Sequence, residues 1–298
     1  MCLAWCVAFL SAALPAAAQL LVTTDQRQAT QGAAAAEILS AAIGPPSKVD
    51  LFDEATLRLT EKLNFVQRDV ASRYLRAFNR PDPKDLVGMF VYGGRDNWFA
   101  VLRFVRDGFV DASAIRNWTT DDVLASIKAQ VEDDNKERSA QGEPLLTVAG
   151  WLIPPTYDAA THSINWAASI PPVTASRERD SEAVHNIAIF GRDGYFLVEI
   201  YASAGEIRDK RGDARLFIDH LKFVDGKRYE DFRRGVDPTA HGGLDAVFGV
   251  RELRHVGLFE GQLDPDMLMI FLVGGGLTLG AGALGLARYM MYRRRYAR

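Results

Sequence analysis

The chain has 298 residues, a formal net charge of −3 and 48% hydrophobic residues. This balance is typical of a globular protein, and it excludes a strongly basic nucleic-acid-binding chain and a highly charged disordered one. The only cysteines are Cys2 and Cys6. If both leave with a signal peptide, the rest of the chain has no disulfide, no thiolate nucleophile and no cysteine metal ligand.

Residues 1–18 are predicted to be a signal peptide. The apolar segment LAWCVAFLSAALPAAAQ reaches three alanines before Gln19, and such small residues suit signal peptidase. No lysine or arginine precedes Arg27, which is atypical, so the start codon could lie upstream. An uncleaved N-terminal span and a lipoprotein attached through Cys6 are alternatives, but Pro15 and the alanines favour cleavage.

Residues 19–47 are rich in alanine, glutamine and threonine, and they are predicted to form a flexible lead with a short helix over residues 33–42. An extracytoplasmic domain is expected over residues 48–235. Its first elements are a predicted hairpin in KVDLFDEATLRL and a helix in RDVASRYLRAF. That helix has one apolar face, formed by Val70, Ala71, Tyr74, Leu75 and Phe78.

The next segments predict an antiparallel sheet. VGMFVYG and WFAVLRFV are apolar and β-branched, so they are predicted to be central strands. Two pairs, Asp107-Gly108 and Asp193-Gly194, follow apolar runs and favour tight hairpin turns. The second pair is the clearer signal, because apolar runs lie on both sides of it.

Two more helices are predicted after these strands. Thr119 and Asp122 form a capping-box pattern at the start of the first helix. Its apolar face is Val123, Ile127 and Val131, and the apolar stripe of the second helix is Ala214, Phe217, Ile218 and Leu221. Because helices do not alternate regularly with strands, the expected fold class is α+β, a mainly antiparallel sheet with helices packed on its faces.

The stretch YDAATHSINW is the first candidate for chemistry, since it places Asp158 near His162. Apolar residues alternate on both sides of it, so residues 158–163 are predicted to connect two strands. Aspartate and threonine in a turn accept hydrogen bonds from nearby backbone amides, and this structural role explains them without catalysis. His162 with Asp158 remains only a weak catalytic candidate.

Other site patterns are absent from the sequence. The five histidines are isolated from one another, so no metal site is predicted. A Gly-x-Gly-x-x-Gly pattern at residues 280–285 lies inside a long apolar run rather than between a strand and a helix, so no nucleotide cofactor is predicted either.

That apolar run, residues 267–287, contains no charged residue and is predicted to be a transmembrane helix, long enough to cross a hydrocarbon core of about 30 Å. The basic tail over residues 288–298 is expected in the cytoplasm, because clustered arginines mark that side. Gly276 and Gly280 form a GxxxG pair that would permit self-association of the span. The arginines that set this orientation are Arg288, Arg293, Arg294 and Arg295.

The segment before the run, residues 236–266, is predicted to be juxtamembrane. Within it, GGLDAVFGVRELRHVGLF places apolar residues opposite basic ones. This segment could lie along the outer membrane surface or dock onto the domain core.

Several segments in order resemble the membrane-anchored bacterial proteins grouped as domain of unknown function 2167. They are WFAVLRFVRDGFV, DNKERSAQG, VAGWLIPPTYDAATHSINWA, FGRDGYFLVEIYA, FIDHLKFVDGKRYEDF and the terminal apolar run. The resemblance spans residues 44–290 and departs from the family pattern after Phe232. It implies a secreted domain with a membrane anchor and no established catalytic residues. The order of elements is also similar to the sandwich of PsbP-like proteins, an analogy of fold alone.

From these observations we expect a non-enzymatic protein of the bacterial inner membrane. A single helix would hold it in the bilayer, the bulk of the chain would be periplasmic, and the domain would bind a protein or another envelope component. No nucleic-acid partner is expected. The alternative is a hydrolase of envelope material that uses His162 with a nearby carboxylate.

Overall fold

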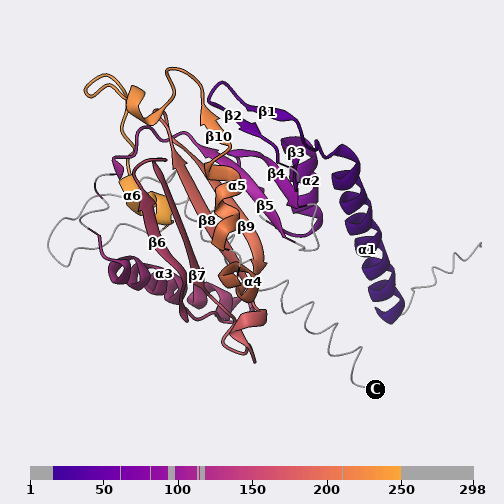
Figure 1. The fold of residues 1–298 in the computed structure, drawn as a ribbon. Helices are drawn as coiled ribbons and strands as arrows, with labels where there is room; N and C mark the ends of the chain where they lie inside the picture. Colours follow the sequence, from indigo (N-terminus) through magenta and orange to yellow (C-terminus); the bar gives the residue numbers. More distant parts are fainter. Residues whose placement is uncertain are drawn as a thin grey trace, which may run out of the picture.

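A computed structural model describes residues 16–60, 62–80, 82–92, 98–112, 114, 118–209 and 211–249 of the chain. Figure 1 shows helices packed around a large twisted sheet. The helices are α1 (Ala16–Ala41), α2 (Arg68–Ala77), α3 (Thr120–Ala140), α4 (Ala204–Asp209), α5 (Arg215–Ile218) and α6 (Gly243–Phe248). The strands are β1 (Lys48–Leu51), β2 (Ala55–Arg58), β3 (Leu63–Gln67), β4 (Leu86–Tyr92), β5 (Phe99–Val105), β6 (Gly150–Asp158), β7 (Ser163–Ser169), β8 (Glu182–Phe190), β9 (Tyr195–Ser203) and β10 (Leu221–Phe223).

The strands form two antiparallel sheets. Seven strands follow the order β3-β4-β5-β9-β8-β7-β6, and three follow the order β1-β2-β10. Every paired neighbour in both sheets is antiparallel. The predicted α+β class with a mainly antiparallel sheet is therefore confirmed.

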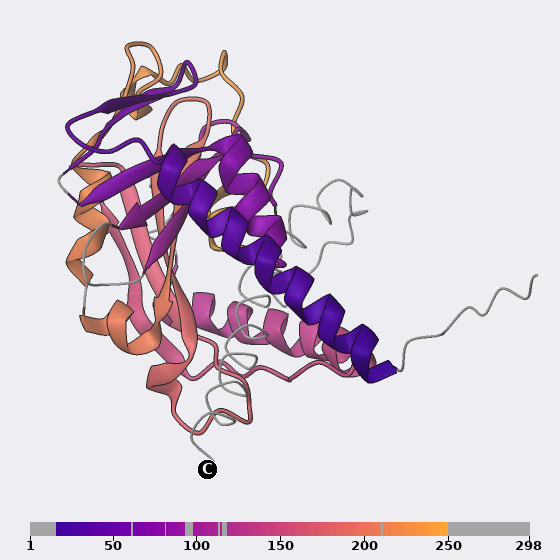
Figure 2. The ribbon, with the colours of Figure 1, turned by 90° about the vertical axis from the view of Figure 1, so that its right-hand side faces the viewer.

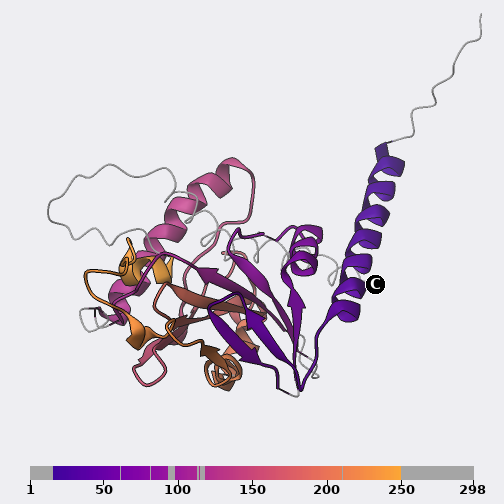
Figure 3. The same ribbon diagram turned by 90° about the horizontal axis from the view of Figure 1, so that it is seen from above.

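The two faces of the large sheet bury different layers. Alternate side chains of β9 point to opposite faces, as strand geometry requires. Phe196 and Val198 pack with α5 and the small sheet, whereas Tyr195 and Leu197 pack with α3 and α6. Figure 3 shows α2 and α3 on one side of the sheet and α5 on the other.

The hairpin predicted at Asp193-Gly194 is confirmed, since it joins β8 to β9 with Phe190 opposite Tyr195. Gly194 has a φ of 154°, and a Cβ added there would overlap the carbonyl oxygen of Val105. Glycine is required at this position because the neighbouring chain comes so close.

The hairpin predicted at Asp107-Gly108 is wrong. Gly108 does have a positive φ of 95°, but the chain beyond it does not return along β5. Phe109 instead forms a parallel bridge with Thr239, far away in the sequence. Both long edges of β5 are already occupied by β4 and β9, so no place remains for a third strand.

Helix α1 is longer than the short helix predicted over residues 33–42. Its last turns pack on α2 through Ile38, which is buried with Ala71 and Leu75. Arg73 of α2 also contacts Glu37 with Nη2 and Oε1 2.5 Å apart. Figure 2 shows the other end of α1 extending away from the sheet.

The sequence left two positions open for the segment GGLDAVFGVRELRHVGLF, along the membrane surface or docked onto the domain core. Helix α6 forms the described part of this segment. Leu244, Val247 and Phe248 are buried in the cluster formed with α3. The helix therefore docks onto the domain core. Its last described residue, Gly249, ends it with a left-handed φ of 66°.

The predicted membrane features lie outside the described residues. They are the run over 267–287, Gly276, Gly280, Arg288, Arg293, Arg294 and Arg295. Among the helices of residues 16–249 that the structure describes, none combines the length and the apolar character that a membrane crossing needs.

Candidate functional site

The turn between β6 and β7 holds the two residues singled out from the sequence. Asp158 Oδ1 accepts a hydrogen bond from the Ala160 amide at 2.9 Å, and its Oδ2 lies 3.7 Å from Arg215 Nη2. His162 has a left-handed φ of 47°. The predicted connection between two strands is confirmed, and the Asp158 carboxylate stabilises that turn.

The His162 ring packs between tyrosines. It stacks on Tyr229 with ring centroids 4.2 Å apart and planes inclined by 18°. Its Nδ1 lies 3.4 Å from the Tyr157 hydroxyl oxygen. The contacts within the described chain do not include one between His162 and the Asp158 carboxylate, so the structure places these two residues in separate interactions.

Tyr229 belongs to a segment that crosses the ends of several strands. We call this segment, residues 224–241, the strap. Phe109 donates its amide to the Pro238 carbonyl oxygen at 2.9 Å, and Ala240 donates its amide to the Phe109 carbonyl oxygen at 2.9 Å. The Phe109 ring also stacks on Phe232 with centroids 3.8 Å apart. The Asp107-Gly108 turn therefore directs the chain toward the strap.

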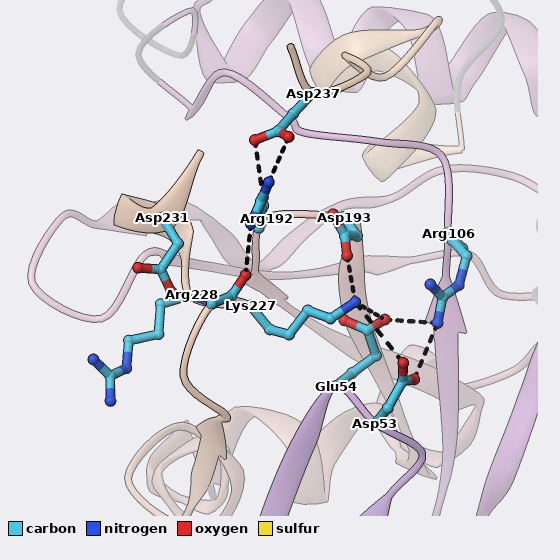
Figure 4. Close-up of polar contacts among 10 residues, drawn as sticks. Asp53, Glu54, Arg106, Arg192, Asp193, Lys227, Arg228, Asp231 and Asp237 are labelled. Carbon is cyan, nitrogen blue, oxygen red and sulfur yellow. Dashed lines mark hydrogen bonds and ion pairs between the residues drawn. The ribbon is translucent and has the colours of Figure 1, made fainter. Parts of the chain in front are cut away.

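Ion pairs join the strap to two strand turns, as Figure 4 shows. Lys227 Nζ lies 2.6 Å from Asp193 Oδ2 and 3.1 Å from Glu54 Oε1. The same Glu54 oxygen lies 2.6 Å from Arg106 Nη2. Glu54 is only 1% exposed, so these two cations compensate a carboxylate that burial would otherwise disfavour.

A second ion pair, between Arg192 and Asp237, holds the C-terminal part of the strap. Both carboxylate oxygens of Asp237 accept from Arg192, at 2.8 Å from Nε and 2.6 Å from Nη2. This bidentate contact lowers the pKa of Asp237 below its usual value. Arg192 also donates its backbone amide to the Lys227 carbonyl oxygen at 3.0 Å.

These contacts create one continuous surface. We call it the strap end, and it consists of the strap with the turns at residues 52–54, 159–162 and 191–194. It carries partly exposed aromatic rings beside charged groups that pair with one another. The sequence indicated two of its parts separately, but the histidine and the tyrosine are 67 positions apart and no sequence pattern linked them.

The sheet interior contains a second polar group that the sequence analysis missed. Arg103 forms two contacts of 2.9 Å with the Asp85 carboxylate, and its Nη1 lies 3.7 Å from Glu199 Oε1. Burial raises the pKa of Glu199 to about 7, although Arg103 opposes this rise. The signal in the sequence was a single charge within an apolar strand, as in VLRFV and FLVEI.

His185 of β8 is also buried, with 2% exposure, and within the described residues its Nε2 has no hydrogen-bond partner. Burial lowers the pKa of its imidazole to about 4, so the ring is neutral. Neither Glu199 nor His185 faces solvent, so both belong to the interior of the sheet rather than to the strap end.

Chemically, the strap end resembles a recognition surface more than a reaction centre. Lys227, Arg192, Glu54 and Asp237 are paired with one another or with neighbouring charges, and the His162 ring is stacked on Tyr229 with its Nδ1 near the Tyr157 hydroxyl. No cluster of histidine, cysteine, aspartate or glutamate suited to a metal ion occurs among the residues described.

Two solved structures are weakly similar in fold. One is the solution structure of cyanobacterial PsbP (CyanoP) from Synechocystis sp. PCC 6803, with 8% identity and a TM-score of 0.35, covering 60% of this chain and 92% of that chain. The other is the Saccharomyces cerevisiae Ran-binding protein MOG1P, with 13% identity and a TM-score of 0.31, covering 63% of this chain and 98% of that chain. A comparison with curated proteins finds no match.

The sequence itself matches a protein family. The family model described as protein of unknown function (DUF2167) matches residues 44–275, which include both sheets and the whole strap. The chain therefore belongs to the DUF2167 family.

Proposed function

We propose that this chain is a membrane-anchored envelope protein whose periplasmic domain binds an envelope component through the strap end, without catalysing a reaction. The observation that carries this proposal is the stack of His162 on Tyr229. It joins two of the segments that carry the family resemblance, VAGWLIPPTYDAATHSINWA and FIDHLKFVDGKRYEDF, so these two segments contribute to one surface.

The geometry of this surface supports binding. Lys227 and Arg192 each hold the strap through carboxylates, so the strap is fixed before any ligand arrives. A preorganised surface loses less conformational entropy on binding than a mobile one. Tyrosine and arginine, both present here, are enriched in protein recognition sites.

The same geometry offers little support for hydrolysis. A histidine base needs a nucleophile within reach and a group that orients its ring. Here the described contacts of the His162 ring are with Tyr157 and Tyr229. The Asp158 carboxylate instead accepts a hydrogen bond from a backbone amide of its own turn and lies near Arg215.

The membrane part of the proposal rests on the sequence. The uncharged run over residues 267–287 and the arginines after it favour a single-pass anchor in the inner membrane, with the domain in the periplasm. The Gly276 and Gly280 pair supports close approach of two such helices, so self-association through the span is part of the proposal.

Site-specific photocrosslinking in cells tests the proposal. A photoreactive residue replaces Glu230, which is exposed on the strap, and a matched one replaces Lys128, which is exposed on α3. We expect adducts with a lipid or a protein from position 230 and none from position 128. Equal labelling from both positions, or none from position 230, would contradict a binding role for the strap end.

A further inference from the structure

We infer that the strap end rests on the anionic outer surface of the membrane that anchors the chain. Phe52 and Val236 would enter the interfacial layer, and Arg233 and Arg234 would pair with lipid phosphates. This inference rests on the proposed function and names the component that the strap end binds.

Phe52 is the first observation. It lies at the turn between β1 and β2, its side chain is 56% exposed, and its φ is 57°. A bulky residue in this left-handed region is strained, and glycine or asparagine would be tolerated better. Packing does not explain the phenylalanine, because it is exposed. A strained, exposed aromatic residue is therefore a candidate for contact with something outside the domain.

Val236 presents a second apolar side chain on the neighbouring segment, with 71% exposure. The turn that carries it is rigid. Val236 and Asp237 donate their amides to the Arg233 carbonyl oxygen at 3.1 and 3.0 Å. Arg192 holds the Asp237 carboxylate, so Val236 is displayed on a fixed tip.

Figure 1 shows the turn between β1 and β2 and the strap at the same end of the molecule. The ion pairs confirm their proximity, because Lys227 Nζ lies 3.1 Å from Glu54 Oε1 and 3.9 Å from Asp53 Oδ2. The turn that carries Phe52 is therefore joined to the strap that carries Val236, and both apolar side chains belong to the same end of the molecule.

Two exposed arginines, Arg233 and Arg234, precede Val236. Among the described residues no salt bridge joins either side chain to a carboxylate, although the charge of Arg233 also helps to lower the pKa of Asp237. The strap carboxylates before them are Glu230 and Asp231, and Asp231 accepts from the Arg228 amide at 2.9 Å. Arginine binds phosphate oxygens well, and anionic lipids attract basic residues near the bilayer surface.

The tether favours the bilayer over a freely diffusing ligand. Only the 17 residues from 250 to 266 separate Gly249 from the apolar run. Even fully extended, they reach about 60 Å. The anchor therefore keeps the domain close to lipid headgroups at a high effective concentration, so weak contacts suffice to hold it there.

The chain also offers a matched control. Val173 is 60% exposed and donates its amide to the Leu145 carbonyl oxygen at 2.9 Å. Val173 lies near the open end of the β6–β7 hairpin, the end remote from the turn at residues 159–162. At that open end Gly150 pairs with Ser169, and Leu146 and Pro172 form a further bridge just outside this pair. A bilayer that contacts the strap end would not contact Val173.

The test uses the full chain with Cys2 and Cys6 replaced by serine. A single cysteine replaces Phe52, Val236 or Val173 and carries a nitroxide spin label. The protein is reconstituted in vesicles of phosphatidylglycerol with phosphatidylethanolamine, or of phosphatidylcholine alone. Collision rates of the label with oxygen, which is enriched in lipid, and with a water-soluble nickel chelate report its depth.

We expect high oxygen and low nickel collision rates at positions 52 and 236 in the anionic vesicles, and water-like rates at position 173. The paired changes Arg233→Ala and Arg234→Ala should return position 236 to the rates of position 173, as should the phosphatidylcholine vesicles. Water-like rates at positions 52 and 236 in anionic vesicles would overturn the inference.

Shielding of both labels from both reagents in detergent micelles would also overturn it, because a protein or a second copy would then cover the strap end. Extraction by alkaline carbonate separates this failure from failure of the anchor. A protein that stays in the vesicles with water-like labels contradicts the inference alone, whereas a protein that washes out contradicts the proposed function.

Discussion

The ring of His162 lies on the ring of Tyr229, with centroids 4.2 Å apart and planes only 18° from parallel. This contact connects the β6–β7 turn to the strap. It gives the histidine a structural role that comes from the packing of its ring.

The stack predicts a clear order among substitutions. His162→Ala removes the ring contact and should lower the free energy of unfolding by about 1 kcal/mol. His162→Phe keeps an aromatic ring on Tyr229, so it should lower the free energy of unfolding by less than His162→Ala does. Urea unfolding of the full chain in detergent, followed by tryptophan fluorescence, measures both.

The same pair of variants distinguishes binding from hydrolysis in cells. If the protein binds without catalysis, His162→Phe should preserve a measurable phenotype, because the strap stays in place. A folded His162→Phe protein that loses the phenotype would instead favour an imidazole base, and so the hydrolase.

Two adjacent basic residues should differ sharply in importance. Lys227 forms ion pairs with the buried Glu54 and with Asp193. Lys227→Met should therefore lower the free energy of unfolding by about 1–3 kcal/mol. Arg228 pairs with Asp225, which is 92% exposed, so Arg228→Met should cost at most about 0.5 kcal/mol. Equal costs in urea unfolding would show that the Lys227 pairs do not hold the strap.

The buried Glu199 and His185 should have opposite effects on stability as pH changes. The pKa of Glu199 is raised from 4.5 to about 7 in the folded chain, so its stabilising contribution is complete below pH 4.5 and is lost as pH rises to about 7. The pKa of His185 is lowered from 6.5 to about 4, so its contribution is complete above pH 6.5 and is lost as pH falls to about 4.

Between these limits the two effects oppose each other. Relative to the unchanged chain, Glu199→Gln should gain stability as the pH rises from 4.5 to 7, by about 3 kcal/mol in total. His185→Leu should show the reverse trend, gaining stability as the pH falls from 6.5 to about 4. Urea unfolding at a series of pH values measures these differences, and parallel curves for the variants and the unchanged chain would contradict them.

Glycine substitutions test the close approach at the β8–β9 turn. Gly194→Ala would place a Cβ against the Val105 carbonyl oxygen, so it should cost at least about 2 kcal/mol. Gly142→Ala is the control, because Gly142 has a φ of 69° with open space around it. Strain alone should then cost about 1 kcal/mol. Thermal unfolding of both variants gives the comparison, and equal losses would show that the contact is not tight.

Much of the fold follows from local patterns in the sequence. The capping box is present, with the Thr119 hydroxyl accepting from the Asp122 amide at 3.1 Å, and Val123 and Ile127 are buried below it as their spacing predicted. The hairpin at Asp193-Gly194 also formed as predicted, because its turn and both of its strands are contiguous in the chain.

The features that the sequence did not predict depend on distant partners. Gly108 has the positive φ of a turn, but the partner of Phe109 is Thr239, and no local rule identifies it. Leu221 has helical spacing with Phe217 and Ile218, yet it begins β10 because β2 offers an open edge there. The strap end was missed for the same reason, since it is assembled from the strap and three turns that are far apart in the sequence.

The most direct measurement of the central claim is the side of the membrane on which the domain lies. Alkaline phosphatase is active only after export, so we expect activity when it is fused after Leu263 and none when it is fused after Arg298. An inactive fusion at Leu263, or an active one at Arg298, would contradict a periplasmic domain held by one C-terminal helix.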